Sequence, residues 1–155
     1  MRIMLDSNIH DRLLADPDAP RRVGSLEYSG LIVLVTTHVQ CDELSATDEP
    51  KRSLLLKLGL KFEETPTSGA VWAISKWDQA TWGDGAGDVK LSDVISDKGN
   101  HIRDALIATT AAAECEVLVT DEKKRLPNKI KNAGSRLKVW NSEQFISCVK
   151  LQTSD

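Results

Sequence analysis

The chain has 155 residues and a mass of 17.1 kDa, with 41% hydrophobic residues, 28% charged residues and a formal net charge of -3. This length is typical of one domain, the composition is too apolar for a disordered chain, and the acidic balance disfavours a general nucleic-acid binder. The longest apolar run, residues 31–35, is far shorter than the roughly 18 residues of a membrane helix. Three scattered cysteines, with Asp6 interrupting the apolar amino terminus, predict a cytoplasmic protein without a signal peptide or a membrane partner.

Short apolar runs rich in β-branched residues alternate with stretches of helical spacing. In chain order, the patterns predict a strand over 2–5, a helix over 8–15, a strand over 31–36, helices over 38–45, 51–58 and 100–114, a strand over 116–120, a helix over 122–131, a strand over 137–140 and a helix over 142–150. This alternation predicts a three-layer α/β fold, with helices on both faces of a central, mainly parallel sheet. We expect residues 1–155 to form a single domain.

Residues 83–99 interrupt the alternation with four glycines and the four aspartates Asp84, Asp88, Asp93 and Asp97. A calcium-binding EF-hand loop would need a different spacing and a closing glutamate. We therefore predict a Gly/Asp-rich excursion before the 100–114 helix, in which the aspartates cap helices or face solvent.

Three tryptophans, Trp72, Trp77 and Trp82, precede this excursion at intervals of five residues. That spacing does not keep them on one helix face. They are interpreted as residues of a core edge or a protein interface, with stacking on RNA bases as the alternative.

Four carboxylates occupy positions where a parallel α/β fold places chemistry. Asp6 follows the first strand and Asp121 follows the 116–120 strand, and ligands of such folds bind beyond the carboxyl ends of the strands. Glu43 lies in the 38–45 helix, and Asp104 lies in the first turn of the 100–114 helix. Converging carboxylates repel one another unless a cation neutralises them, and an all-oxygen set suits Mg²⁺ or Mn²⁺.

Each acid also has an ordinary structural interpretation. Asp6 and Asp121 are each placed to cap the helix that follows, and Glu43 would then be solvated beside Asp42. Neighbouring positions on a helix lie about 100° apart, so only one of the pair Asp42 and Glu43 should face a site.

The segments that carry these acids resemble a known family. Leu5-Asp6-Ser7-Asn8-Ile9 is similar to the opening motif of PIN-domain nucleases, and residues 36–44, with Glu43 before Leu44, resemble the second block of that family. Residues 103–111 resemble its helical block, which begins with an aspartate, and residues 118–121 resemble its closing strand. Residues 137–145 are similar to its last strand and helix, so the blocks follow the family order over nearly the whole chain.

The resemblance implies a PIN-like, metal-dependent ribonuclease, most often the toxin of a bacterial toxin–antitoxin pair. It implies a catalytic tetrad of Asp6, Glu43, Asp104 and Asp121, with Asn8 and Thr120 orienting the acids. It also implies a homodimer and an antitoxin protein that covers the acidic cleft.

The mechanism expected is hydrolysis of an RNA phosphodiester by water activated on one or two metal ions. Asp6, Asp104 and Asp121 would hold the metal, Glu43 would be a further ligand or the general base, and the products would carry a 5′-phosphate and a 3′-hydroxyl. Single-stranded RNA is the expected substrate. The candidate RNA contacts are Lys123, Lys124, Arg125 and His101, whereas His10 and His38 are interpreted as structural.

A different class of function remains open. A PIN-like scaffold would bind RNA or a protein partner without cutting. The presence of all four acids favours the enzyme. A phosphatase is disfavoured because no second aspartate follows Asp6 at the spacing that such enzymes use.

Overall fold

The computed structural model describes residues 1–58, 60–72, 74–85, 87–95 and 101–153. The elements in chain order are β1 (Arg2–Leu5), α1 (Ile9–Ala15), α2 (Ala19–Tyr28), β2 (Val33–Thr36), α3 (His38–Ser45), α4 (Lys51–Lys57), β3 (Phe62–Glu64), α5 (Leu91–Val94), α6 (Ile102–Glu114), β4 (Val117–Val119), α7 (Arg125–Asn132), β5 (Lys138–Trp140) and α8 (Ser142–Gln152). The strands form one parallel sheet in the order β3-β2-β1-β4-β5. The prediction of an α/β fold with a parallel sheet is confirmed.

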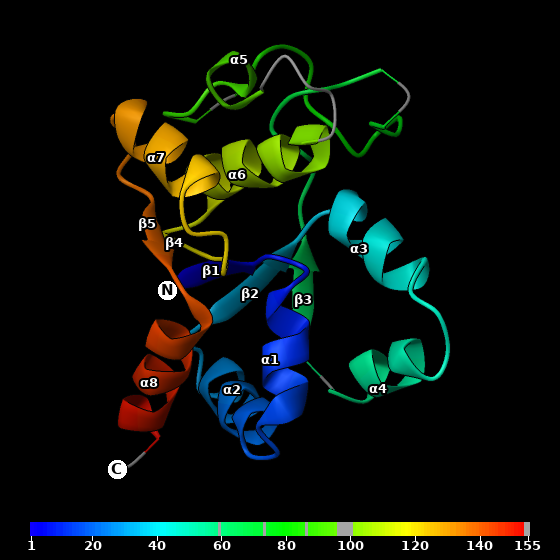
Figure 1. Ribbon diagram of the computed structural model, residues 1–155, viewed down its shortest axis with the longest axis vertical. Coiled ribbons are helices and arrows are strands. Elements are labelled where there is room, and N and C mark those ends of the chain that lie inside the picture. Colours follow the sequence, from blue (N-terminus) through cyan, green and yellow to red (C-terminus); the bar gives the residue numbers. More distant parts are fainter. Residues whose placement is uncertain (59, 73, 86, 96–100, 154–155) are drawn as a thin grey trace.

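Two apolar cores lie on opposite faces of the sheet because successive strand residues point to opposite sides. Ile3 and Leu5 of β1 are buried with residues of α1, α2 and α8, whereas Met4 between them is buried with residues of α3, α6 and α7. Figure 1 shows α6 and α7 on one side of the sheet and α1, α2 and α8 on the other. The three layers therefore follow from the alternation of apolar residues along short strands.

The largest differences from the sequence prediction are three additional elements. Helix α2 has a buried series with helical spacing, Ala19, Val23 and Leu26, but polar or charged residues, a proline and a glycine separate these positions and weaken the pattern. The edge strand β3 is three residues long and mostly exposed, so it carries no apolar alternation. The one-turn helix α5 lies within the predicted excursion.

The excursion is longer than residues 83–99, since it begins directly after β3. Its described part is fixed to α6, where Thr110 Oγ1 accepts a hydrogen bond from Ser68 N at 2.8 Å. Val89 and Val94 of the excursion are fully buried in the core that contains residues of α6 and α7. Two of its aspartates bind backbone N–H groups of α5 or its cap, as predicted: Asp84 accepts from Ser92 N, and Asp93 accepts from Lys90 N. Positions 86 and 96–99 of the predicted excursion, and position 100 of the predicted 100–114 helix, lie outside the described residues.

None of the helices in the described ranges has the length and apolarity needed to cross a membrane.

Gly87 marks a close backbone contact between the excursion and α6. A Cβ atom at this position would lie 2.8 Å from Ala113 N and 2.9 Å from Ala112 C. Because both are backbone atoms of a helix, they cannot move aside easily. We predict that Gly87→Ala lowers the free energy of unfolding by roughly 1–3 kcal/mol, measured by urea denaturation.

Gly24 provides the matched control. It lies inside α2, and a Cβ atom there would have nothing within 4 Å. Gly24→Ala should raise stability by up to about 1 kcal/mol, because alanine favours helix more than glycine does. Equal effects of the two substitutions would contradict the close contact.

Candidate functional site

Asp6 lies at the carboxyl end of the central strand. Its backbone N–H donates to Val119 O at 2.9 Å, which continues the pairing of β1 with β4. Its carboxylate accepts three hydrogen bonds: Oδ2 from Thr120 Oγ1 at 2.6 Å and from Asn8 Nδ2 at 3.0 Å, and Oδ1 from Ser7 N at 2.8 Å. Asn8 and Thr120 therefore both contact the acid that the resemblance implied they orient.

Helix α3 brings Glu43 to the same place. Gln40 in its first turn is buried, accepts from Thr37 N at 3.1 Å and donates from Nε2 to Leu5 O, which joins the start of α3 to the end of β1. One turn later, Glu43 Oε2 accepts a hydrogen bond from Ser7 Oγ at 2.5 Å. Asp42 points elsewhere, to Lys76 Nζ at 2.6 Å. Of the two neighbouring acids, Glu43 is the one that faces Asp6.

Asp104 lies in the first turn of α6 and is half-exposed. Its Oδ2 lies 2.6 Å from Arg125 Nη2 and 3.4 Å from His101 Nδ1. Two of the residues predicted to contact RNA are thus partners of a predicted catalytic acid. Lys123 and Lys124, which directly precede Arg125 in the chain, are exposed.

The electrostatics of Asp6 show that these acids act on one another. Burial raises the pKa of Asp6 above its ordinary value, and the negative charges of Asp104 and Glu43 raise this pKa further. The hydrogen bond from Thr120 opposes these effects without cancelling them. The carboxylates of Glu43 in α3 and Asp104 in α6 therefore lie close enough to Asp6, at the end of β1, to disfavour the ionisation of Asp6.

Asp121 is held differently. Its carboxylate accepts from Ser142 N at 2.9 Å and Ser142 Oγ at 3.0 Å, and it pairs with Arg12 Nε at 3.1 Å. Burial raises its pKa, but the hydrogen bonds from Ser142 and the charge of Arg12 outweigh burial and hold this pKa below its usual value. Asp121 therefore binds the amino terminus of α8, whereas Glu122 accepts from Arg125 N and Leu126 N of α7. The interpretation of Asp121 as the cap of the helix that follows it, α7, is therefore wrong, because Asp121 binds the first residue of α8.

The donor set at this edge of the sheet is made of oxygen atoms, which suits a hard divalent cation. The pKa of Asp6 stays raised, by burial first and by the charges of Asp104 and Glu43 next, although Thr120 and Ser7 donate hydrogen bonds to its carboxylate. Within the described part of the chain, however, no group of three or more His, Cys, Asp or Glu side chains is placed to hold a metal ion. Two of the predicted ligands are instead paired with guanidinium groups, Asp104 with Arg125 and Asp121 with Arg12.

Sequence reasoning missed several residues that build the site, namely Ser7, Arg12, Gln40 and Ser142. Thr37 and Gln40 have the spacing of a capping box, which was a visible signal. The pairing of Arg12 with Asp121 joins residues 109 apart in the chain, and nothing local indicates it.

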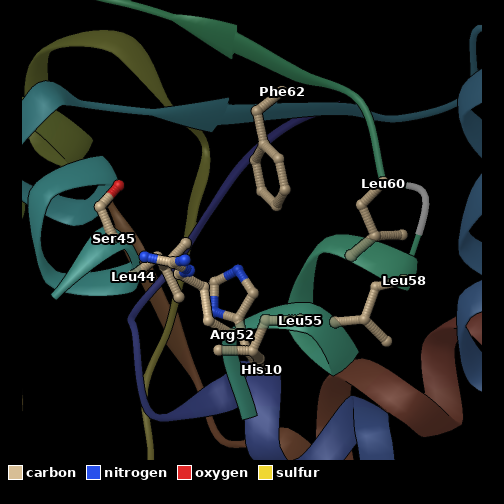
Figure 2. A pocket seen from close by; sticks show the side chains of 8 residues that line it. All are labelled: His10, Leu44, Ser45, Arg52, Leu55, Leu58, Leu60 and Phe62. Carbon is tan, nitrogen blue, oxygen red and sulfur yellow. The ribbon is translucent and has the colours of Figure 1, made fainter. Parts of the chain in front are cut away.

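A separate apolar cavity of about 440 Å³ lies behind the Ser7 turn. Figure 2 shows Phe62 of β3 pointing toward His10 of α1, with Leu55 of α4 and the following Leu58 and Leu60 on one side. The two rings lie 5.7 Å apart, and His10 Nδ1 is 3.3 Å from Ser7 O. Burial lowers the pKa of His10, which favours the neutral ring. His10 and His38 are both buried, as their structural interpretation predicts.

A comparison of the chain with protein families, curated proteins and solved structures finds no match.

Asp6 should reduce stability at neutral pH. A carboxyl group with a raised pKa in the folded state favours folding when protonated, so stability falls as pH rises from about 4 through that pKa. Asp6→Asn removes this cost, because the Thr120 hydroxyl and the Asn8 amide can reverse their hydrogen bonds. We predict a gain on the order of 1 kcal/mol at pH 7, or roughly 2–4 °C in Tm by calorimetry, that disappears near pH 3.

Asp121 should show the opposite dependence. Its lowered pKa gives stability that is present above about pH 4 and is lost as pH falls through the folded-state pKa. Asp121→Asn should therefore cost on the order of 1 kcal/mol at pH 7 and nothing near pH 2, read from the same calorimetric series. Parallel pH profiles for the two variants would contradict the assigned environments.

Proposed function

We propose that the protein is a metal-dependent endoribonuclease, with RNA as its substrate and Mg²⁺ or Mn²⁺ as its cofactor. The observation that carries this proposal is the partly buried carboxylate of Asp6, whose pKa is raised first by burial and then by the negative charges of Asp104 and Glu43. Such an environment is useful at a catalytic site, because a bound cation would offset the repulsion among the acids. The PIN-like order of the motifs in the chain supports the same reaction.

In this proposal Asp6 and Asp104 hold the cation, and Asp121 joins them by exchanging Arg12. The cation would supply Lewis-acid chemistry and offset the charge of the phosphodiester. Glu43, held by Ser7, accepts a proton from the attacking water. The new P–O bond forms as the bond to the 3′-oxygen breaks, and that oxygen takes a proton from solvent. The products are a 5′-phosphate and a 3′-hydroxyl.

The resemblance extends the proposal to the biological setting. We place the protein in the bacterial cytoplasm as the toxin of a toxin–antitoxin pair, acting as a homodimer. Its antitoxin would cover the acidic edge of the sheet.

A non-catalytic scaffold is the second candidate, and one observation favours it. Arg125 and Arg12 already neutralise Asp104 and Asp121 without a metal ion. A scaffold would keep these ion pairs when RNA or a protein partner binds.

Cleavage of a labelled single-stranded RNA separates the two candidates. We predict cutting with Mg²⁺ or Mn²⁺ and none with EDTA, and a rate at least about 100-fold lower in Asp6→Asn and Glu43→Gln. Asp11→Asn is the matched control, since Asp11 is an exposed acid of α1 that pairs with Lys51, and its rate should equal that of the unsubstituted protein. Cutting that survives EDTA would overturn the metal mechanism. RNA binding without any cutting would favour the scaffold.

A further inference from the structure

The excursion after β3 exposes three large aromatic side chains on one surface. Trp72, Trp77 and Trp82 are 93%, 81% and 78% exposed, so their placement at a core edge is wrong. They line a groove of about 660 Å³. The rings of Trp77 and Trp82 meet edge to face, with centroids 5.6 Å apart. We call residues 70–72 and 74–83 the tryptophan loop.

The backbone beneath these side chains is well fixed. Thr67 N donates to Gln79 O at 2.9 Å, and Thr81 N donates to Thr67 O at 2.8 Å, which closes the two ends of the loop. Val71 N donates to Ser75 Oγ at 2.8 Å, and Val71 and Ile74 pack against the core. The described backbone of the loop is therefore anchored at both ends, so a ligand that stacks on the tryptophans has less backbone to order.

The tryptophan loop adjoins the acidic edge of the sheet. Lys76, between Trp72 and Trp77 in the chain, pairs with Asp42 of α3 at 2.6 Å, and the next residue, Glu43, faces Asp6. In Figure 1 the green segment between β3 and α5 lies above α3 and α6. Both side chains of the Lys76–Asp42 pair are half-exposed, so the ammonium group is accessible to a phosphate.

We propose that the tryptophan loop stacks the unpaired bases of single-stranded RNA whose backbone crosses the acidic edge. This inference rests on the proposed ribonuclease function and specifies which residues bind the bases of its substrate. Indole faces stack on any base, and Lys76 supplies a cation for the adjacent phosphate. Recognition of this kind selects unpaired strands, because the bases of a duplex are already stacked on one another.

A second copy of the chain fits the surface less well. A stable protein interface buries about 800 Å² on each partner, and three tryptophans bury at most roughly 150–250 Å² each. Among the described residues of the excursion, they are the only large exposed hydrophobic side chains. The exposed tryptophans therefore form a small aromatic surface, or platform, without the larger apolar area that a dimer interface needs.

Binding of RNA without metal tests the platform separately from catalysis. The probe is a labelled 12-nucleotide oligoadenylate in EDTA, followed by fluorescence anisotropy and by quenching of tryptophan emission. We predict that Trp77→Ala and Trp82→Ala each weaken binding roughly 5- to 150-fold, that Trp77→Phe keeps most of the affinity, and that a 12-base-pair RNA duplex quenches little. Tyr28→Ala is the matched control, an aromatic residue at the end of α2 that is 95% exposed, and it should bind as the unsubstituted protein does.

Unchanged affinity in both alanine variants would overturn the platform, whether or not the protein cuts RNA. Loss of self-association in these variants by sedimentation velocity, without any RNA binding by the unsubstituted protein, would assign the surface to a second copy and also overturn it. Binding that depends on the tryptophans, together with no cleavage under Mg²⁺ or Mn²⁺, would support the platform while the ribonuclease proposal failed.

Discussion

The repulsion among carboxylates at the end of the central strand is the constraint that shapes this edge of the molecule. Asp6 is held there because β1 lies in the middle of the sheet, with β2 on one side and β4 on the other. Thr120, Asn8 and Ser7 direct hydrogen bonds to its carboxylate, and still its pKa stays above the ordinary value. Removing one of these acids would lower this cost in stability, and the proposed function would explain why the chain carries all three.

Two arginines offset part of the negative charge at this edge of the sheet. Arg125 from α7 pairs with Asp104, and Arg12 from α1 pairs with Asp121, so each guanidinium offsets the charge of one acid at the rim. Asp6 accepts hydrogen bonds from hydroxyl, amide and backbone donors, whereas Glu43 accepts one from Ser7 Oγ and lies 4.0 Å from Arg103 Nη1. A divalent cation would have to compete with Arg125 for Asp104. Under the proposed function, the affinity for the cation would depend on this ion pair between Asp104 and Arg125, and it would weaken wherever the ion pair is strengthened.

The parts of the fold that local pattern determines were predictable. β1, β2, β4 and β5 were found from their apolar runs, and α6 from its apolar spacing, because those residues fill the two cores. β3 could not be predicted in this way, because an exposed edge strand of three residues has no apolar run. At the site, the prediction was that Asp6, Glu43, Asp104 and Asp121 all meet, and nothing in the sequence indicated that the Asp121 carboxylate binds Ser142. That orientation depends on how α8 starts after β5, which is a property of packing between distant segments.

In the proposed complex, the tryptophan loop would bind the RNA bases, and the acidic edge would bind the cation. Three carboxylates repel an RNA backbone, so a strand needs attractive contacts beside the acids if it is to remain there long enough to react. In the proposed complex, stacking would supply most of that attraction, with Lys76 as the one cation of the tryptophan loop, so that little positive charge is added to pair with the acids as Arg125 does. Exposed indoles beside the carboxylates would then hold a polyanion through its bases and leave the acids available for a cation.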